Sequence, residues 1–434
     1  MRKPVILVII SLIFSIYSIA IAGNTETPPQ ALTISQAIDY ALSHNRDVKI
    51  QEAAYRISQA QIANTKSNWL FQLDWSAQYN QMDNGNNKGG QANTVLEADK
   101  PILSFGKSKF DIQRTQIQSN RELIALEKTR QDIAYQVTVA FFNVLYQNEL
   151  VKVNEAAVLS AKEHLESAEL RLKQGVNTKF DVTRSKVDLA NRQMDLISAQ
   201  NAAEKARQSF NQLLFVNPSD NIKLVGDLTY QEYRPLMDEL WALTLKHRPQ
   251  ILDKQQAIEQ NTAWLNYQKA VYYPTLSLGG KYTLEYTDYS GADGKESDQW
   301  SAYLKFTSPL LDGGKRKSQI QVAKVTLEQA QYDLEQEKLA AKTELEQTIL
   351  DLTKREEMVK TSKATIELAE LSLSMAQLSY ENGKGTTLDV TDAELSLRTA
   401  RINQAKAIND YLASLAQLKK VTGSDLPGEE KLFQ

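Results

Sequence analysis

Two aspartates near the C-terminal end of the chain, Asp389 and Asp392, have the side-chain type and spacing to attract cations. They are three residues apart in a segment rich in helix-forming residues, so both carboxylates lie on one face of the expected helix. Several copies of the chain around one axis would gather these carboxylates. A local role competes with this one, because an aspartate at the start of a helix caps it and stabilises the positive end of its dipole.

Other chemistry has little support in the sequence. The three histidines, His44, His164 and His247, are far apart, and we expect them to be surface or helix-end residues rather than metal ligands. There is no cysteine and no nucleophile elbow, and residues 313–318 lack the first glycine and spacer of a phosphate-binding loop. The net charge of −3 argues against a nucleic-acid partner. The sequence therefore predicts no enzyme activity, cofactor or metal site.

Two short motifs each occur twice in the chain, and the second of them includes Asp389. Residues 101–109 and 309–317 share a proline, a glycine and three further positions. A second shared motif begins 74 residues after each proline, at residues 175–183 and 383–391. A duplicated unit of this size indicates a pseudo-symmetric fold.

The sequence divides into four parts. Residues 1–22 have the charged start, apolar run and small-residue cleavage site of a secretory signal peptide, and a retained membrane anchor is the alternative. The two repeats occupy residues 23–229 and 230–425, and residues 426–434 form a C-terminal tail.

Long helices are predicted in both repeats. Two segments without internal proline or glycine, about 106–174 and 314–382, favour helices of about 100 Å each. Return helices are expected at about 180–215 and 388–421. Each long helix carries an apolar residue at every seventh position: Val137, Val144, Val151, Val158, Leu165 and Leu172, then Leu345, Leu352, Val359, Ile366, Leu373 and Tyr380. This repeat predicts left-handed supercoiling around neighbouring helices. An ordinary coiled-coil rod would show the same repeat and is the alternative.

Four segments alternate apolar and polar residues instead, at about 71–82, 93–103, 274–287 and 298–309. Their lengths suit transmembrane β-strands, and polar, glycine-rich loops join them in pairs. A soluble antiparallel sheet is the alternative. Four membrane strands leave open edges in hydrocarbon, so the chain must oligomerise if it spans a membrane. Two copies would give eight strands, and three would give twelve with room for a lumen.

The polar face of these strands carries charge: Asp74, Glu97, Asp99, Lys281, Glu285 and Lys305. Charged side chains on the inward face of a barrel indicate water rather than a packed core. From the residues alone we infer a pore.

Together these features resemble the TolC-type outer-membrane efflux protein family over essentially the whole mature chain. The start at residues 32–41, the two Pro-(Ile/Leu)-Leu-x-x-Gly-Lys strand exits and the two Gly-x5-Asp-Val turns carry the resemblance. It implies a mixed α/β membrane protein built from two repeats. Three chains of four strands each would form a trimeric, twelve-stranded β-barrel, continued in the periplasm by a long α-helical coiled-coil barrel.

The resemblance also implies a function. The chain would be the exit duct of a tripartite efflux or type I secretion system in the outer membrane of a Gram-negative bacterium. Its partners would be a periplasmic adaptor protein, an inner-membrane transporter and outer-membrane lipid. The alternative is a structural or adhesive coiled-coil envelope protein without a through-channel. The sequence does not specify the cargo, although the absence of histidine-rich or methionine-rich loops lowers the case for dedicated metal export.

Site residues follow from the same resemblance. The pair Asp389 and Asp392 would line the tightest point of the closed tube, and Arg184 replaces the second aspartate in the first repeat. Tyr380 and Asp181 would form a latch at the closed tip. Gly385 stands where the family can have a latch arginine, so Arg171 or Arg184 are the alternatives. The residues expected to contact the adaptor lie at the two tip turns: Leu172, Gly175, Thr178, Phe180, Gly383, Thr386 and Leu388.

Overall fold

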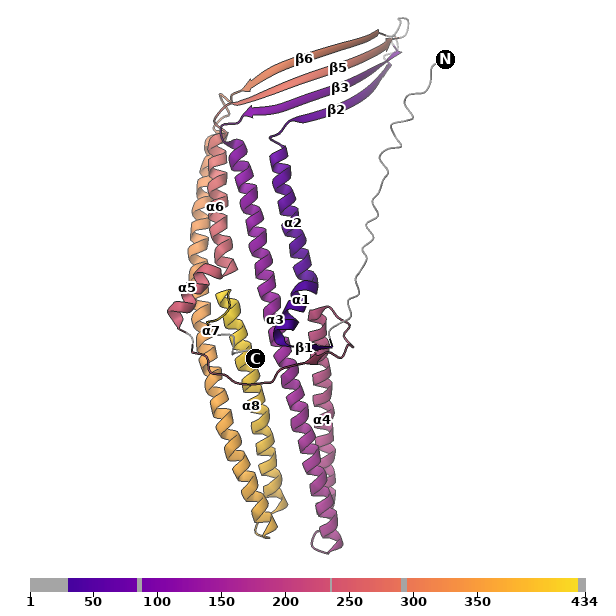
Figure 1. Ribbon diagram of the computed structural model, residues 1–434, viewed down its shortest axis with the longest axis vertical. Coiled ribbons are helices and arrows are strands. Elements are labelled where there is room, and N and C mark those ends of the chain that lie inside the picture. Colours follow the sequence, from indigo (N-terminus) through magenta and orange to yellow (C-terminus); the bar gives the residue numbers. More distant parts are fainter. Residues whose placement is uncertain (1–29, 84–87, 235, 290–294, 428–434) are drawn as a thin grey trace.

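The computed structural model describes residues 30–83, 88–234, 236–289 and 295–427. The predicted signal peptide and most of the predicted C-terminal tail lie outside these ranges. The molecule is elongated, with one sheet at one end and two helical hairpins at the other (Figure 1). Among the described helices, none has a stretch that is long, apolar and uncharged enough to cross a bilayer.

The sheet consists of four antiparallel strands in the order β2-β3-β5-β6. Their bounds are β2 (Gln72–Asp83), β3 (Lys88–Leu103), β5 (Thr275–Tyr289) and β6 (Lys295–Thr307). Each repeat contributes one hairpin, and the two hairpins meet where β3 pairs with β5. The four predicted strands are therefore present, and they form a single sheet.

The strand register separates polar from apolar side chains. One row across all four strands contains Asp74, Glu97, Lys281 and Ser301. The adjacent row contains Trp75, Leu96, Tyr282 and Trp300. Successive residues of a strand point to opposite faces, so the charged row and the aromatic row lie on opposite sides of the sheet. The alternation predicted from sequence is confirmed as one polar and one apolar face.

Several strand bounds differ from those predicted, among them the start of β3 and the end of β6. The sequence places β3 from about residue 93, but pairing begins at Lys88, because backbone hydrogen bonds continue through Gly89 and Gly90 whatever their side chains. Gly90 also makes room for the Tyr79 ring, since a Cβ at Gly90 would lie 2.9 Å from its Cζ atom. At the other end β6 stops at Thr307 rather than 309, consistent with the missing amide hydrogen of proline at 309.

Two helices of 67 residues each, α3 (Lys107–Lys173) and α7 (Lys315–Glu381), run from the sheet to the far end (Figure 1). The return helices are α4 (Lys179–Leu214) and α8 (Thr387–Thr422). Every residue of the two seven-residue ladders is buried or half-buried. The ladders therefore face neighbouring helices, as the sequence predicted.

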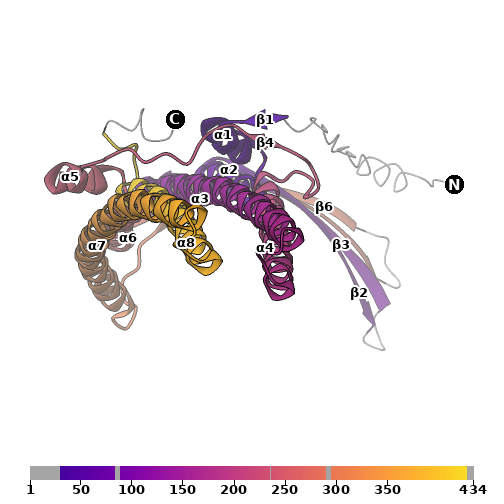
Figure 2. The ribbon, with the colours of Figure 1, turned by 90° about the horizontal axis from the view of Figure 1, so that it is seen from below.

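The half nearer the sheet contains α2 (Arg46–Ser67) and α6 (Pro249–Ala270). Here the helices pack in the order α2-α3-α6-α7, and in the far half the order is α4-α3-α8-α7. Seen along the long axis, the helices follow one another along an arc (Figure 2). One chain therefore forms an open segment of a curved helical wall.

A core at mid-length joins the two repeats. Two short helices that the sequence analysis missed, α1 (Ile34–His44) and α5 (Met237–His247), lie here with a parallel strand pair, β1 (Ala31–Leu32) and β4 (Lys223–Leu224). The largest fully buried side chains of this cluster come from both repeats: Val48, Val137, Phe141, Phe210, Leu214, Leu240, Leu345, Leu352, Tyr411, Leu415 and Leu418. The core fixes the helices from which both far hairpins extend.

Candidate pore constriction and tip turns

Both helical hairpins turn on a left-handed glycine. Gly175 (φ 72°) follows α3 and Gly383 (φ 71°) follows α7. The amide of Val176 donates to the Arg171 carbonyl at 2.9 Å, and in the second repeat the amide of Lys384 donates to the Ser379 carbonyl at 2.9 Å. These bonds close the helix ends as glycine C-caps do.

Each return helix begins with the same capping box. The Asp181 carboxylate accepts hydrogen bonds from the amide and hydroxyl of Thr178, both at 2.8 Å, and the Asp181 amide donates to the Thr178 hydroxyl. In the second repeat Asp389 and Thr386 repeat this pattern at 2.7 Å. Hydrogen bonds from the threonine backbone and hydroxyl lower the pKa of each aspartate. The carboxylates are therefore ionised and fixed in direction.

Asp392 lies three residues further along α8 than Asp389, and both side chains are exposed. The intervening Val390 and the following Ala393 are buried against the neighbouring helices. The structure therefore places the two predicted carboxylates together on the unpacked side of the first turns of α8. The local role considered from sequence is observed, because Asp389 completes the capping box with Thr386 and its side chain is exposed.

The two predicted latch residues have different partners within one chain. The Arg171 guanidinium lies 4.3 Å from the centre of the Tyr380 ring, while Asp181 is held by Thr178. Arg171 is one of the two substitutes named from the sequence. Gly385 is packed tightly, because a Cβ there would lie 3.1 Å from the Tyr380 backbone nitrogen. A side chain at 385 would therefore require the neighbouring backbone of Ser379 and Tyr380 to move by a few tenths of an ångström.

The tips expose large apolar side chains. Val176 and Phe180 at the first turn are 70 % and 73 % exposed, and Leu388 at the second is 44 % exposed. Thr178 and Thr386 are also exposed, whereas Leu172 is half-buried on its ladder. The expected adaptor-contact residues thus lie at the end of the molecule farthest from the sheet (Figure 1).

One prediction about the histidines was wrong. His44 and His247 do end α1 and α5, but His164 lies inside α3, more than two turns before its end at Lys173, and is half-buried against α8. Its Nε2 atom is 2.7 Å from Oε1 of Glu394, a residue of the other repeat. No local spacing connects residues 230 positions apart, so a single sequence carries no direct signal for this pair.

The sheet with one apolar face and the long helical wall with paired tips define a class, the outer-membrane channels with a helical extension. A family model described as "Outer membrane efflux protein" matches residues 37–214 and 240–424. The chain belongs to this family. The two matched segments correspond to the two repeats.

Individual relatives are distant but nearly full-length. The cation efflux system protein CusC of Escherichia coli (strain K12) is 22% identical over 407 residues, which cover 87% of this chain and 84% of the relative. The solvent efflux pump outer membrane protein SrpC of Pseudomonas putida is 23% identical over 406 residues, covering 89% and 84%. Protein CyaE of Bordetella pertussis is 23% identical over 331 residues, covering 74% and 70%.

Solved structures show the same fold. A crystal structure of CusC has a TM-score of 0.76 at 19% identity and covers 91% of this chain and 92% of that one. The outer membrane protein VceC of Vibrio cholerae has a TM-score of 0.73 at 16% identity, covering 91% and 97%. The protein is an outer-membrane efflux channel of a Gram-negative bacterium, of the kind used in tripartite efflux and type I secretion, and not an enzyme.

Proposed function

We propose that three copies of this chain close into one channel whose narrowest point is lined by Asp389 and Asp392. The observation that carries this proposal is the pair of open edges of the sheet. Among the described strands, β2 and β6 each pair on one side only, and they run in opposite directions. β6 of one chain can therefore pair antiparallel with β2 of the next, and three chains give a closed barrel of twelve strands.

The helical wall supports the same closure. The two ends of the arc in Figure 2 expose apolar side chains that no helix of the same chain covers. On α7 they are Val322, Tyr332, Leu339, Leu350, Leu368, Leu371, Met375 and Leu378. On α2 and α4 they are Ile50, Ile57, Val187, Met194 and Ile197. Contact between α7 of one chain and α2 and α4 of the next would bury both sets.

Threefold symmetry would place six carboxylates near the channel axis, two from each chain. The equivalent of Asp392 in the first repeat is Arg184, so only the second repeat contributes both acidic residues. A ring of ionised carboxylates in a narrow pore favours cations over anions. The constriction would therefore select by charge as well as by width.

The exposed tip residues support a docking role for the far end. Phe180 and Leu388 occupy equivalent positions of the two turns and expose apolar surface that a periplasmic adaptor can cover. The adaptor would connect the channel to an inner-membrane transporter, which supplies the energy. Relatives carry names for cation and solvent efflux, so the cargo of this chain is set by those partners rather than by the tip.

Conductance of the purified protein in planar bilayers tests the constriction. We expect a small cation-preferring conductance, and loss of that preference in the double variant Asp389→Ala, Asp392→Ala. Asp392→Asn alone removes charge while leaving the capping box, and Asp181→Ala removes the equivalent box of the first repeat without touching the ring. An unchanged preference in the double variant, or an equal effect of Asp181→Ala, would count against the assignment.

A further inference from the structure

A polar cluster crosses the seam between the two repeats, where α3 packs against α8. Oε1 of Glu394 accepts a 2.6 Å hydrogen bond from the Ser160 hydroxyl and lies 2.7 Å from Nε2 of His164. The side chains of His164 and Glu394 are 31% and 21% exposed. Partial burial reduces screening of this pair by water and also removes part of the hydration of both side chains.

One helical turn further along α8, Arg398 makes a second set of contacts across the same seam. Its Nη1 atom lies 2.7 Å from Oδ2 of Asp195 on α4 and 3.3 Å from Oδ1 of Asn154 on α3. Glu394 and Arg398 therefore attach the same face of α8 to the first repeat at two successive turns.

The duplication shows that this cluster is specific to one seam. An offset of 208 residues relates the repeats at the tips, as Gly175 and Gly383 show. At this offset the counterparts of Glu394, Arg398, His164 and Ser160 are Lys186, Ala190, Ser372 and Leu368. In the proposed trimer the counterpart seam lies between chains, where α7 meets α4 of the next copy. These four counterparts cannot form the same cluster, because none of them is a carboxylate or a histidine.

We propose that Ser160, His164 and Glu394 form a positioning clasp that holds the start of α8 against α3 in the closed channel. This inference rests on the proposed constriction. Glu394 follows Asp392 by two residues, about 3 Å along the helix axis. A rigid helix transmits any movement over that distance, so releasing Glu394 lets both aspartates move away from the axis.

The clasp depends on pH. The hydrogen bond to Glu394 raises the pKa of His164 above its ordinary value of 6.5, with smaller contributions from the charges of Asp188 on α4 and Glu163 on α3. The bonds to His164 and Ser160 lower the pKa of Glu394 despite its burial, and Arg192 on α4 acts in the same direction.

The raised pKa of His164 means that its charge favours the closed state at pH 6.5 and below, as long as Glu394 stays ionised. That contribution is lost as the pH rises through the raised value. The channel should therefore open more readily at mildly alkaline pH.

The test is single-channel recording on the complete assembled protein between pH 6 and pH 9. We expect the wild type to show a rising open probability across the titration of His164. His164→Gln and Glu394→Gln should be open more often at pH 6.5, by roughly tenfold, which corresponds to one charge-assisted hydrogen bond. Both variants should also lose the pH dependence.

Two controls come from the chain itself. The double variant His44→Gln, His247→Gln removes the other histidines and should retain the wild-type profile. Glu169→Gln removes an exposed ion pair between α3 and Lys186 of α4, inside one hairpin, and should also retain it.

Two results would overturn the clasp: a flat wild-type profile, or His164→Gln channels that assemble normally and keep the pH dependence. The proposed constriction is tested by a different measurement, the ion selectivity of the channel. Asp392→Asn should weaken the cation preference and keep the pH dependence of the open probability, whereas the clasp variants should lose that pH dependence.

Discussion

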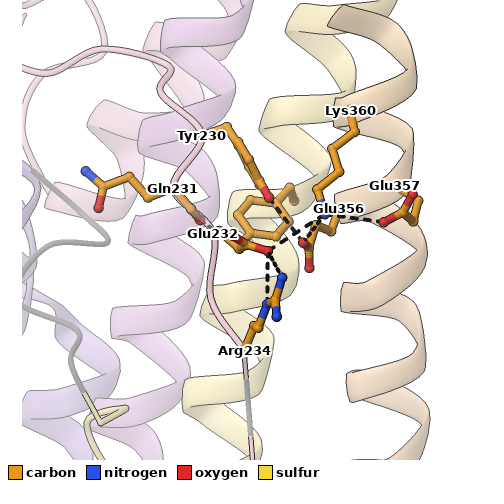
Figure 3. A network of polar contacts seen from close by, with 8 residues as sticks. Tyr230, Gln231, Glu232, Arg234, Glu356, Glu357 and Lys360 are labelled. Carbon is orange, nitrogen blue, oxygen red and sulfur yellow. Dashed lines mark hydrogen bonds and ion pairs between the residues drawn. The ribbon is translucent and has the colours of Figure 1, made fainter. Parts of the chain in front are cut away.

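The hydroxyl of Tyr411 donates a 2.8 Å hydrogen bond to the carbonyl oxygen of Gln231, which lies 180 residues earlier in the chain. Tyr411 is fully buried on α8, and Gln231 belongs to the segment that connects the two repeats (Figure 3). The Tyr230 ring meets the Tyr411 ring edge-on at 5.0 Å. The connecting segment is therefore fixed to the last helix by both a hydrogen bond and aromatic packing.

The same segment is also attached to α7. The Tyr230 hydroxyl donates to Glu356 at 3.2 Å, and Lys360 pairs with Glu356 at 2.6 Å and with Glu232 at 3.8 Å (Figure 3). The hydrogen bond that Lys360 donates to Glu356 is the largest cause of its raised pKa. The segment that connects the repeats thus contacts both α7 and α8.

Replacing Tyr411 by phenylalanine should loosen this segment without disturbing the core. The ring stays in place, but the Gln231 carbonyl loses its partner, at a cost of about 1 kcal/mol in the free energy of unfolding. Limited proteolysis of the connecting segment and thermal unfolding in detergent measure the effect. Tyr332→Phe is the matched control, because its hydroxyl contacts Glu328 on the same helix and not the connecting segment, and phenylalanine keeps the ring. Equal resistance of Tyr411→Phe and wild type would contradict this role.

The tip capping boxes should make the turns sensitive to acid. Both aspartates have a lowered pKa in the folded chain, so their stabilisation is fully present above the ordinary value of 3.8 and is lost as the pH falls through the lowered value. Thr178→Ala and Thr386→Ala remove the boxes at neutral pH, at about 1 kcal/mol of local helix stability each.

Hydrogen exchange of the tip amides, corrected for intrinsic rates, measures both effects. Thr353→Ala is the control, because its exposed hydroxyl donates to a carbonyl within α7 and caps nothing. Wild-type protection that stays constant down to pH 2 would show that the carboxylates do not hold the turns.

Much of this architecture could be predicted because it depends on local sequence. The long helices follow from the absence of proline and glycine, and the sheet faces follow from alternation that the register of Glu97 with Lys281 confirms. The helix cap at Asp389 could be predicted from the residue type and its place after the turn glycine. Each of these features depends on neighbours within a few residues.

Features that depend on distant parts of the chain were not predictable in the same way. α1 and α5 are short helices stabilised by the mid-length core, and the Gln231 carbonyl contacts Tyr411 only after the chain has folded. The pairing of His164 with Glu394 likewise requires α8 to pack on α3. Helix propensity and periodicity carry no information about which helices become neighbours.

The contact between Arg171 and Tyr380 gives a test of how the tips are held together. If the ring face binds the guanidinium, Arg171→Ala and Tyr380→Leu should each raise the open-to-closed ratio in bilayer recordings by about threefold, as expected for an exposed cation–π pair. Tyr380→Phe keeps the ring and should behave as wild type. A large effect of Tyr380→Phe with none from Arg171→Ala would instead indicate a hydroxyl latch, such as one to Asp181.

The sheet register makes a prediction that hydrophobicity alone does not. Val95 and Leu96 are adjacent apolar residues of the inner strand β3, but they lie on opposite faces. Leu96 belongs to the row of Trp75 and Tyr282, whereas Val95 lies between Ser76 and Thr283 on the polar face. A lysine at position 96 would therefore enter lipid, while a lysine at position 95 would meet water and nearby carboxylates.

We expect Leu96→Lys to reduce the amount of assembled protein in the outer membrane strongly, because a lysine facing the bilayer interior costs about 2–4 kcal/mol. Each of the three proposed copies would carry this cost, which makes the effect on assembly larger than that on a single chain. Val95→Lys, the matched control, should assemble normally and shift the conductance, since its charge lies inside the channel. Gel mobility of unheated and heated samples gives the assembly, and bilayer recording gives the conductance. Equal assembly of the two variants would show that the aromatic row does not face lipid.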